Sequence, residues 1–424
     1  MFQNVIKHLL VGEFVLLLLV CGIIVYKSQV VDSSGDEVVT GEPITSELIT
    51  LDYENTIGQG SSLEEEVLEN IEAIESTREE MEVAPNSVNE TQESIDGTEE
   101  SLEGTEGTEE KVKDYIKWID FGVTCAAMED AYEYDVESQS SDVKLNWIEL
   151  LSYLGAKYGG DFTRYKSKDM QALVDKIVNQ GMKMDEITKE MQYYNYYHEA
   201  YEAVLGGFVG NYEVETGVNS ETGEKVWETK YGLKAYLPIA KNFPYSDYDD
   251  FGVSRTYGFK RQHLGHDMMG QVGTPIIAVE SGYVEALGWN QYGGWRIGIR
   301  SLDGKRYYYY AHLRKNFPYV KTLEEGSIVQ AGDVIGYLGR TGYSRTENTN
   351  NIDTPHLHFG MQIIFDESQK ECNSEIWIDC YNIVKFLYRN RSETVKNEET
   401  KEWYRTTQII DPSVIDYKQR YGIQ

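Results

Sequence analysis

Apolar and polar positions follow four different patterns along the chain, and each pattern predicts a different kind of structure. Residues 9–26 are almost continuously apolar, whereas residues 31–110 are almost continuously polar. From Lys111 to about Gly207 apolar residues recur every three or four positions, which predicts helices. Beyond Gly210 short apolar runs alternate with turn residues, which predicts strands. The expected fold class is therefore an α+β multidomain chain, with an all-β antiparallel domain preceded by a small all-α domain, a disordered acidic linker and an N-terminal membrane segment. The predicted parts are a membrane or signal segment (1–30), the linker (31–110), the helical domain (111–210), the β-rich domain (211–370) and a C-terminal helix and tail (371–424).

The apolar run from Leu9 to Tyr26 is the predicted membrane segment. Its length of about 18 residues is at the short end for crossing a hydrocarbon core of about 30 Å. No small residues follow at the spacing that signal peptidase needs, which favours an uncleaved anchor over a cleaved signal peptide. Lys7 before the run and the acidic residues after it favour a cytoplasmic amino end. We expect a single-pass protein of the cell membrane whose remaining residues are extracellular, or a secreted protein if the segment is cleaved.

Residues 31–110 carry most of the net charge of the chain. The formal charge of the 424 residues is -32, and this segment holds 25 acidic residues against the single Arg78. It is rich in Glu, Ser, Thr and Gly, so it cannot bury enough apolar surface to fold, and repulsion between like charges extends it into a stalk. The rest of the chain is only mildly acidic and has no basic stretch, which excludes a protein that reads nucleic acid.

Two apolar stripes mark the predicted helical domain. One consists of Leu145, Ile148, Leu151 and Leu154, and the other runs from Met170 to Ile177 and ends before a glycine, Gly181. The tyrosine run at residues 193–197 suggests either stacking on sugars or a tyrosine-lined core, and we favour the core.

Turn residues divide the chain after Gly210 into strands. Asp303-Gly304 predicts a tight hairpin between residues 295–300 and 305–310, which places His312 at the end of a strand.

The residues after Glu367 carry weaker signals. A short helix is expected at Tyr381–Tyr388. Cys372 and Cys380 are close enough in sequence to form a disulfide in an oxidising compartment, with two free thiols as the alternative.

Five of the seven histidines gather between residues 263 and 358, in three short phrases. Imidazole nitrogens together with one carboxylate suit a borderline-soft ion such as zinc. If these phrases lie on strands, alternation puts two histidines of one phrase on the same face, and His263 and Asp267 together on another, with His266 facing away. Three ligands with room for a water make a catalytic zinc site. The phrases are His263-Leu-Gly-His-Asp267, Tyr310-Ala-His312-Leu313 and Pro355-His356-Leu-His358-Phe359.

The residues around these histidines resemble the lysostaphin or LytM-type metalloendopeptidases, which cut peptide bonds in bacterial peptidoglycan and have the duplicated hybrid motif fold. The resemblance covers about a quarter of the chain, from Gly252 to Ile363, and rests on the order and spacing of several motifs. These motifs are His263-x-Gly-x-Asp267, Gly273-Thr-Pro-Ile-Ile-Ala278, Gly282-Tyr-Val284, Tyr310-x-His312-Leu313, Val329-Gln-Ala-Gly-Asp-Val-Ile-Gly336, Gly339-Arg-Thr-Gly342 and His356-Leu-His358-Phe359.

The resemblance implies roles for five residues. His263, Asp267 and His358 would be the zinc ligands, and His312 and His356 would be the catalytic pair, although the sequence does not tell which of the two is the general base. The chemistry agrees, because the unperturbed pKa of imidazole lies close to the working pH, so two further histidines can orient a water and stabilise an oxyanion.

Three further histidines and one tyrosine have weaker cases. His8, His198 and His266 are expected to be surface or satisfied core residues. Tyr257, six residues before the first predicted ligand, is a candidate donor to the oxyanion, with an ordinary buried tyrosine as the alternative.

Two features depart from the family pattern. The connection Tyr343–Thr354 is longer and more polar than usual, and we expect it to form part of one wall of the substrate groove, so the bond preference of a relative should not be transferred. Gly360 stands where many relatives carry a larger polar side chain, which puts in doubt any contact expected there.

The leading hypothesis is a membrane-tethered zinc endopeptidase that cleaves cross-links or stem peptides of peptidoglycan outside the cytoplasmic membrane. Its cofactor would be Zn2+, and its partners would be peptidoglycan peptides, the membrane and a cell-envelope protein that binds the helical domain. The alternative is a non-catalytic cell-wall scaffold or hydrolase activator of the same fold.

Overall fold

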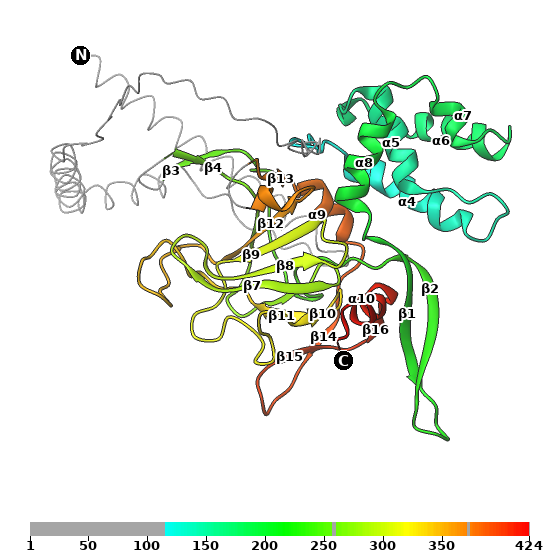
Figure 1. Cartoon of the computed structure of the whole chain (residues 1–424). Coiled ribbons are helices and arrows are strands. Elements are labelled where there is room, and N and C mark those ends of the chain that lie inside the picture. Colours follow the sequence, from blue (N-terminus) through cyan, green and yellow to red (C-terminus); the bar gives the residue numbers. More distant parts are fainter. Residues whose placement is uncertain (1–114, 257–259, 371–373, 424) are drawn as a thin grey trace, which may run out of the picture. The chain divides into compact units, whose positions relative to one another are not determined.

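The computed structural model describes residues 115–256, 260–370 and 374–423 (Figure 1). All the described residues belong to one compact unit. The predicted membrane segment and acidic linker lie outside the described residues. Within the described ranges, no helix combines the length and the apolar character that crossing a membrane requires.

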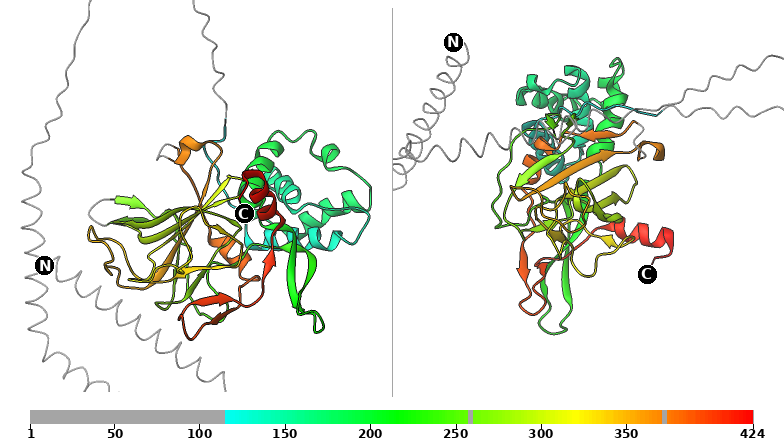
Figure 2. Two further views of the ribbon diagram at one scale, coloured as in Figure 1. Left: turned by 60° about the horizontal axis from the view of Figure 1, so that its bottom comes forward. Right: turned by 90° about the vertical axis from the view of Figure 1, so that its left-hand side faces the viewer.

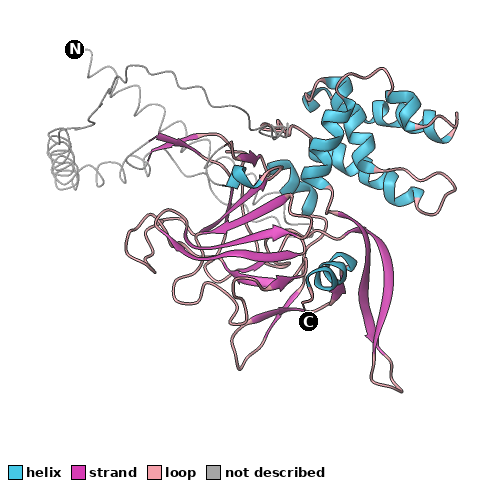
Figure 3. Ribbon diagram, viewed as in Figure 1, coloured by secondary structure: helices cyan, strands magenta, loops and turns pink. Residues whose placement is uncertain are grey.

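Helices occupy the first part of the described chain (Figure 3), so the predicted helical region is confirmed. The first predicted stripe lies on α5, where Asn146 caps the amino end by accepting hydrogen bonds from the backbone amides of Ile148 and Glu149. Gly159 ends this helix in the left-handed conformation, with φ of 65°. The helices are α4 (Cys125–Ser138), α5 (Trp147–Tyr158), α6 (Ser167–Val178), α7 (Met184–Thr188) and α8 (Tyr194–Leu205), with the 3-10 turn η1 (Phe162–Arg164).

The tyrosines of this region divide between core and surface. Tyr201 is fully buried, and its ring contacts those of Phe121 and Phe162 at 5.6 and 6.2 Å. Tyr193 and Tyr196 are exposed. From the run itself, Tyr197 packs partly buried against the core, with its ring 5.5 Å from that of Tyr201. The predicted tyrosine-lined core therefore forms, but mainly from Tyr201, which follows the run.

Strands make up most of the remaining chain, and every strand pair among the described residues is antiparallel. They are β1 (Val209–Val218), β2 (Lys225–Leu233), β3 (Ser254–Thr256), β4 (Lys260–Gln262), β5 (His266–Met269), β6 (Pro275–Ile277), β7 (Gly282–Asn290), β8 (Gly294–Ser301), β9 (Arg306–Ala311), β10 (Ile328–Val329), β11 (Val334–Tyr337), β12 (His356–Ile363), β13 (Ile376–Ile378), β14 (Thr394–Lys396), β15 (Trp403–Arg405) and β16 (Ile409–Ile410).

The largest sheet has the order β10-β7-β8-β9-β12-β13, and β5 also pairs with β12. The predicted hairpin at Asp303-Gly304 joins β8 to β9, and His312 directly follows β9. On its other edge β12 pairs first with β5 and then with β13. This strand therefore brings segments that are far apart in the sequence to one place.

The C-terminal residues are built into the same unit. They include η2 (Glu367–Lys370), α9 (Tyr381–Leu387), which overlaps the predicted helix, and α10 (Pro412–Tyr421). Phe386 of α9 packs against Trp147 and Tyr132 of the helical region, with ring centroids 5.7 and 5.8 Å apart. β16 adds to the hairpin of β1 and β2 as the third strand of a small sheet (Figure 2).

One hydrophobic core runs through the helical and the β-rich residues. The predicted boundaries at residues 210 and 370 stay predictions. Cys372 lies outside the described residues, and Cys380 is buried.

Candidate metal centre

Two strands and the bend before one of them bring the three predicted metal ligands to one point. Asp267 lies on β5 and His358 on β12, directly opposite each other in the antiparallel register. His263 does not share a strand with Asp267, because β4 ends at Gln262 and β5 begins at His266. The bend between the two strands, rather than strand alternation, turns His263 toward the carboxylate.

The potential ligand atoms of these residues lie within bonding reach of one ion. Nε2 of His263 is 3.0 Å from Oδ1 of Asp267 and 3.0 Å from Nδ1 of His358. Nδ1 of His358 is 2.9 Å from the same carboxylate oxygen. A tetrahedral zinc ion with bonds of about 2.0–2.1 Å needs ligand atoms roughly 3.3 Å apart, so this triangle fits with a small expansion. The fourth coordination position of such an ion would be left for water.

Gly265 makes this approach sterically feasible. A Cβ atom at this position would lie 2.5 Å from Cε1 and 2.6 Å from Nε2 of His358. Any side chain here would displace the imidazole, so the glycine between the first two ligands is required by the third.

Groups behind the ligands fix their orientation. Nδ1 of His263 is 3.2 Å from the backbone carbonyl of Asp250, which is an acceptor, so Nδ1 carries the proton and Nε2 presents its lone pair. Arg255 pairs with the carboxylate of Asp250, and its Nη1 donates to Oδ2 of Asp267 at 3.0 Å. This leaves Oδ1 of Asp267 for the ion.

The ligand residues have shifted pKa values for identifiable reasons. Burial alone would raise the pKa of the Asp267 carboxyl, but the adjacent imidazoles of His263 and His358 hold it far below its usual range. Burial lowers the pKa of His358, although Asp267 opposes the shift. An ionised carboxylate with neutral imidazoles is the protonation state that binds a metal.

His312 and His356 stand beside the ligands with their rings 4.8 Å apart. Nδ1 of His312 donates to the carbonyl of Thr341 at 2.9 Å, and Nδ1 of His356 donates to the carbonyl of Thr354 at 2.8 Å. In a neutral ring, each bond directs the lone pair to Nε2. Nε2 of His356 is 3.7 Å from Oδ1 of the ligand carboxylate.

His312 also has an unusual backbone conformation. Its φ is 62°, in the left-handed region that side chains other than glycine seldom adopt. The residue directly follows β9, and its side chain is buried. Burial, with His356 and His358 nearby, lowers the pKa of His312 well below its ordinary value. A strained conformation that persists at such a position is typical of functional sites.

The remaining candidates lie elsewhere. His266 is buried but points away from the cluster, where its Nε2 is 2.8 Å from Oδ2 of Asp247. His198 contacts the ring of Tyr194 in the helical region. Tyr257 and His8 lie outside the described residues.

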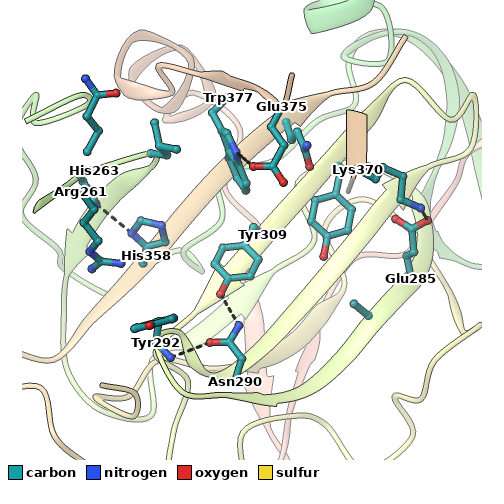
Figure 4. Close-up of a pocket in the computed structure, with 15 residues that line it drawn as sticks. Arg261, His263, Glu285, Asn290, Tyr292, Tyr309, His358, Lys370, Glu375 and Trp377 are labelled. Atoms are coloured by element: carbon teal, nitrogen blue, oxygen red, sulfur yellow. Dashed lines mark hydrogen bonds and ion pairs between the residues drawn. The ribbon is translucent and has the colours of Figure 1, made fainter. Parts of the chain in front are cut away.

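A groove of about 680 Å³ leads away from His263 and His358 across the face of the large sheet (Figure 4). Tyr309 lies in the middle of it, between Trp377 on one side and Asn290 on the other (Figure 4). The connection Tyr343–Thr354 does not contribute to the described lining of this groove. Its first residue instead lies beside the catalytic candidates, with the Tyr343 ring 5.8 Å from that of His312.

Several residues of the site had no recognisable signal in the sequence. Asp250 and Arg255 lie in a stretch with no metal-ligand spacing, and the carbonyls that hold the two histidines belong to ordinary threonines. Trp377 lies beyond the motifs and was not predicted. The tyrosines of β9 could have been placed in the groove from the Asp303-Gly304 turn and the strand register that it sets.

Comparison with known proteins shows what this part of the chain is similar to. Residues 261–373 match the model described as Peptidase family M23. The L-Ala--D-Glu endopeptidase of Bacillus subtilis (strain 168) is 39% identical over 125 residues, which cover 30% of this chain and 36% of that protein. Lysostaphin of Staphylococcus simulans is 39% identical over 98 residues, which cover 23% of this chain and 17% of that protein.

Among solved structures, lytM of Ruminococcus gnavus is 22% identical and has a TM-score of 0.41, covering 64% of this chain and 89% of that one. The chain spans little more than a third of the length of the Bacillus relative and less of lysostaphin. The family match and the two curated relatives confirm the predicted resemblance to lysostaphin and LytM-type peptidases for this part of the chain.

Proposed function

From the premise that residues 261–373 form a Peptidase family M23 domain, we propose that the protein is a zinc endopeptidase that hydrolyses peptide bonds of bacterial peptidoglycan. The observation that carries the proposal is the triangle of His263, Asp267 and His358, whose facing atoms are 2.9–3.0 Å apart. The curated relatives named endopeptidase support the reaction class. Because they cover a limited part of each protein, the substrate is proposed at the level of peptidoglycan peptides only.

The donor set favours zinc over other divalent ions. Two imidazole nitrogens and one carboxylate oxygen, with one position open, are the ligand types and number of a catalytic zinc site. Magnesium and calcium prefer oxygen ligands in larger number, which this cluster does not offer. When bound, zinc polarises a peptide carbonyl and makes a water molecule nucleophilic near neutral pH.

The two imidazoles outside the ligand triangle would move the protons. With Nδ1 of His312 and His356 engaged by backbone carbonyls, Nε2 of each is the atom that accepts or donates. One Nε2 would accept a proton from the attacking water and later deliver it to the leaving amine. The other, once protonated, would donate to the oxygen of the carbonyl under attack. Tyr257 stays a predicted further donor to that oxygen.

The test combines metal analysis with digestion of purified peptidoglycan. The purified full-length chain should contain about one zinc per molecule and should release soluble fragments whose mass reveals the bond that was cut. His263→Ala should lose both zinc and hydrolysis. A protein that holds no zinc would overturn the proposal. A zinc-loaded protein that leaves peptidoglycan intact would instead support the scaffold or activator alternative.

We propose in addition that residues 1–30 anchor the chain in the cell membrane and that the peptidase domain is extracellular. The apolar run and the acidic residues after it support this topology. Fractionation of cells, followed by protease treatment of intact spheroplasts, tests it. The proposal requires that the protein sediment with membranes and that the protease remove the peptidase domain.

A further inference from the structure

The groove beside the metal centre has an aromatic floor that depends on two glycines. Gly298, Tyr309 and Gly360 lie opposite one another on β8, β9 and β12. A Cβ atom at Gly298 would lie 1.8 Å from the hydroxyl of Tyr307, and one at Gly360 would lie 2.8 Å from the indole of Trp377. The absence of these side chains lets the tyrosine and tryptophan rings lie against the sheet on either side of Tyr309.

Trp377 is linked to the metal ligands by successive ring contacts. The His358 ring is 6.0 Å from that of Tyr309, and the Tyr309 ring is 6.3 Å from that of Trp377. Because an extended peptide rises about 3.3–3.6 Å per residue, a substrate that crosses these rings reaches Trp377 within about four residues of the metal.

Glu375 stands next to Trp377 in the wall of the groove (Figure 4). Its Oε2 accepts a hydrogen bond of 2.9 Å from Nε1 of Trp377. This bond orients the carboxylate without neutralising it, because the indole is an uncharged donor. No ion pair within the described ranges includes Glu375.

The other charged groups of the groove already have partners. Glu285 pairs with Lys370 and lies 3.6 Å from Nη1 of Arg300. The guanidinium of Arg261 lies over the ring of Tyr343 at 4.9 Å. Of the two carboxylates in the described lining, Glu285 is ion-paired and Glu375 is not, and Glu375 lies beside an indole, whose face also attracts cations.

We propose that Glu375 and Trp377 form a specificity subsite for a primary ammonium group of the substrate peptide. The proposal rests on the proposed function, since it takes the groove as the place where the cleaved peptide binds. The ammonium belongs either to the side chain of a basic residue or to a free amino terminus. A short peptide carrying this charge would gain a charge-assisted hydrogen bond that its acylated form cannot make.

The test measures binding to the zinc-loaded full-length His312→Ala variant, so that no peptide is cleaved during the measurement. Calorimetry compares a lysine-containing stem peptide with two derivatives, one acetylated at the lysine side chain and one acetylated at the amino terminus. Acetylation of the recognised amine should weaken binding about tenfold, and the derivative that shows the loss identifies the source of the ammonium.

Variants of Glu375 in the same background assign the effect to this carboxylate. Glu375→Gln should bind the free and the acetylated peptides equally. Glu375→Lys should reverse the preference and bind a peptide whose amine is succinylated more tightly than the free amine, a result that a purely structural role of Glu375 would not produce. Glu228→Gln, at an exposed position on β2, is the matched control and should keep the original discrimination.

The outcomes separate the two proposals. If the wild-type groove does not discriminate the amine from its acetylated form, or if Glu375→Gln discriminates as well as the parent, the subsite is wrong. Zinc content and the release of fragments from peptidoglycan by the wild-type chain report on the proposed function independently, because binding is measured without turnover. A loss of discrimination in Glu375→Gln together with unchanged zinc content supports the subsite.

Discussion

At the scale of single residues, the site separates side chains that would hold the ion from side chains that would move protons. His263 and His358 each have a ring nitrogen within 3.0 Å of Oδ1 of Asp267, whereas Nε2 of His356 is 3.7 Å from it and His312 binds the carbonyl of Thr341. The two groups of histidines should therefore respond differently to substitution.

We expect His312→Ala to keep its zinc and to lose turnover. Removing a general acid or base lowers the rate by about 10²–10⁴-fold, while the ligand triangle is unchanged. Zinc content by elemental analysis and the rate of fragment release from peptidoglycan measure the two effects separately. Loss of zinc in His312→Ala would show that this histidine supports the metal, and full activity would remove it from the reaction.

Substitution of Arg255 tests how much a residue that orients a ligand contributes to zinc affinity. Its Nη1 donates to Oδ2 of Asp267 at 3.0 Å, which keeps Oδ1 directed at the ion. Arg255→Met should weaken zinc binding about 10- to 100-fold, the usual cost of losing a group that orients a ligand. Competition with a chromogenic chelator measures the affinity. Arg420→Met, at an exposed position on α10, is the control, and equal affinity in the two variants would contradict the prediction.

At the scale of elements, the site exists because β12 pairs with β9 on one edge and with β5 on the other. β5 carries Asp267 and β12 carries His358, and His312 is the residue directly after β9. The same unit also contains contacts between its strands and the C-terminal helices. One of them is an ion pair whose carboxyl group, that of Asp411, has a shifted pKa.

Asp411 couples α10 to the end of β2. Its side chain accepts a hydrogen bond from the backbone amide of Ser413 at the start of the helix. Its Oδ1 forms an ion pair with Nζ of Lys234 at 2.9 Å. Burial alone would raise the pKa of Asp411, but Lys234 holds it below the usual value. A carboxyl with a lowered pKa in the folded state stabilises the fold fully above the ordinary pKa of aspartate, about 3.9, and less as the pH falls through its folded value.

Asp411→Asn should therefore cost about 2–3 kcal/mol of unfolding free energy at pH 7, since it leaves Lys234 without its buried partner and weakens a helix cap. The difference from the wild type should shrink as the pH is lowered from 7 to 3. Urea titrations across this range measure it, with Asp416→Asn, exposed on the same helix, as the control. A difference that grows toward acid would contradict the assigned direction.

Elements also show where sequence patterns were sufficient. The Asp303-Gly304 turn fixed the register of β8 and β9, and periodicity located α5 and α6, because local propensity and tertiary packing agree there. The bend between β4 and β5 was not predicted, since it arises from the approach of His358 to Gly265, a contact between residues far apart in the chain. The C-terminal strands were also missed, because each has only two or three residues and forms by pairing with a distant partner.

At the scale of the whole molecule, the helical and the β-rich residues are tied together by buried polar groups as well as by the shared core. Arg306 of β9 is fully buried, and its Nη1 donates to the carbonyl of Ala203 in α8 at 2.7 Å. The same guanidinium pairs with Glu280, which also accepts from Tyr308. A guanidinium buried in this way is costly if any of its acceptors is removed.

This connection predicts that the peptidase residues do not tolerate removal of the helices. A chain that begins at Gly207 loses the carbonyl acceptor of Arg306 and the rings that cover Phe386, so we expect its melting temperature to fall by about 10 °C or more. A chain that lacks only residues 1–114 keeps these contacts and serves as the control, with an unchanged melting temperature and unchanged rate on soluble peptides. If the shorter chain melted at the same temperature and cleaved faster, the helices would be a separate domain that restrains the peptidase, and the shared core would not contribute to its stability.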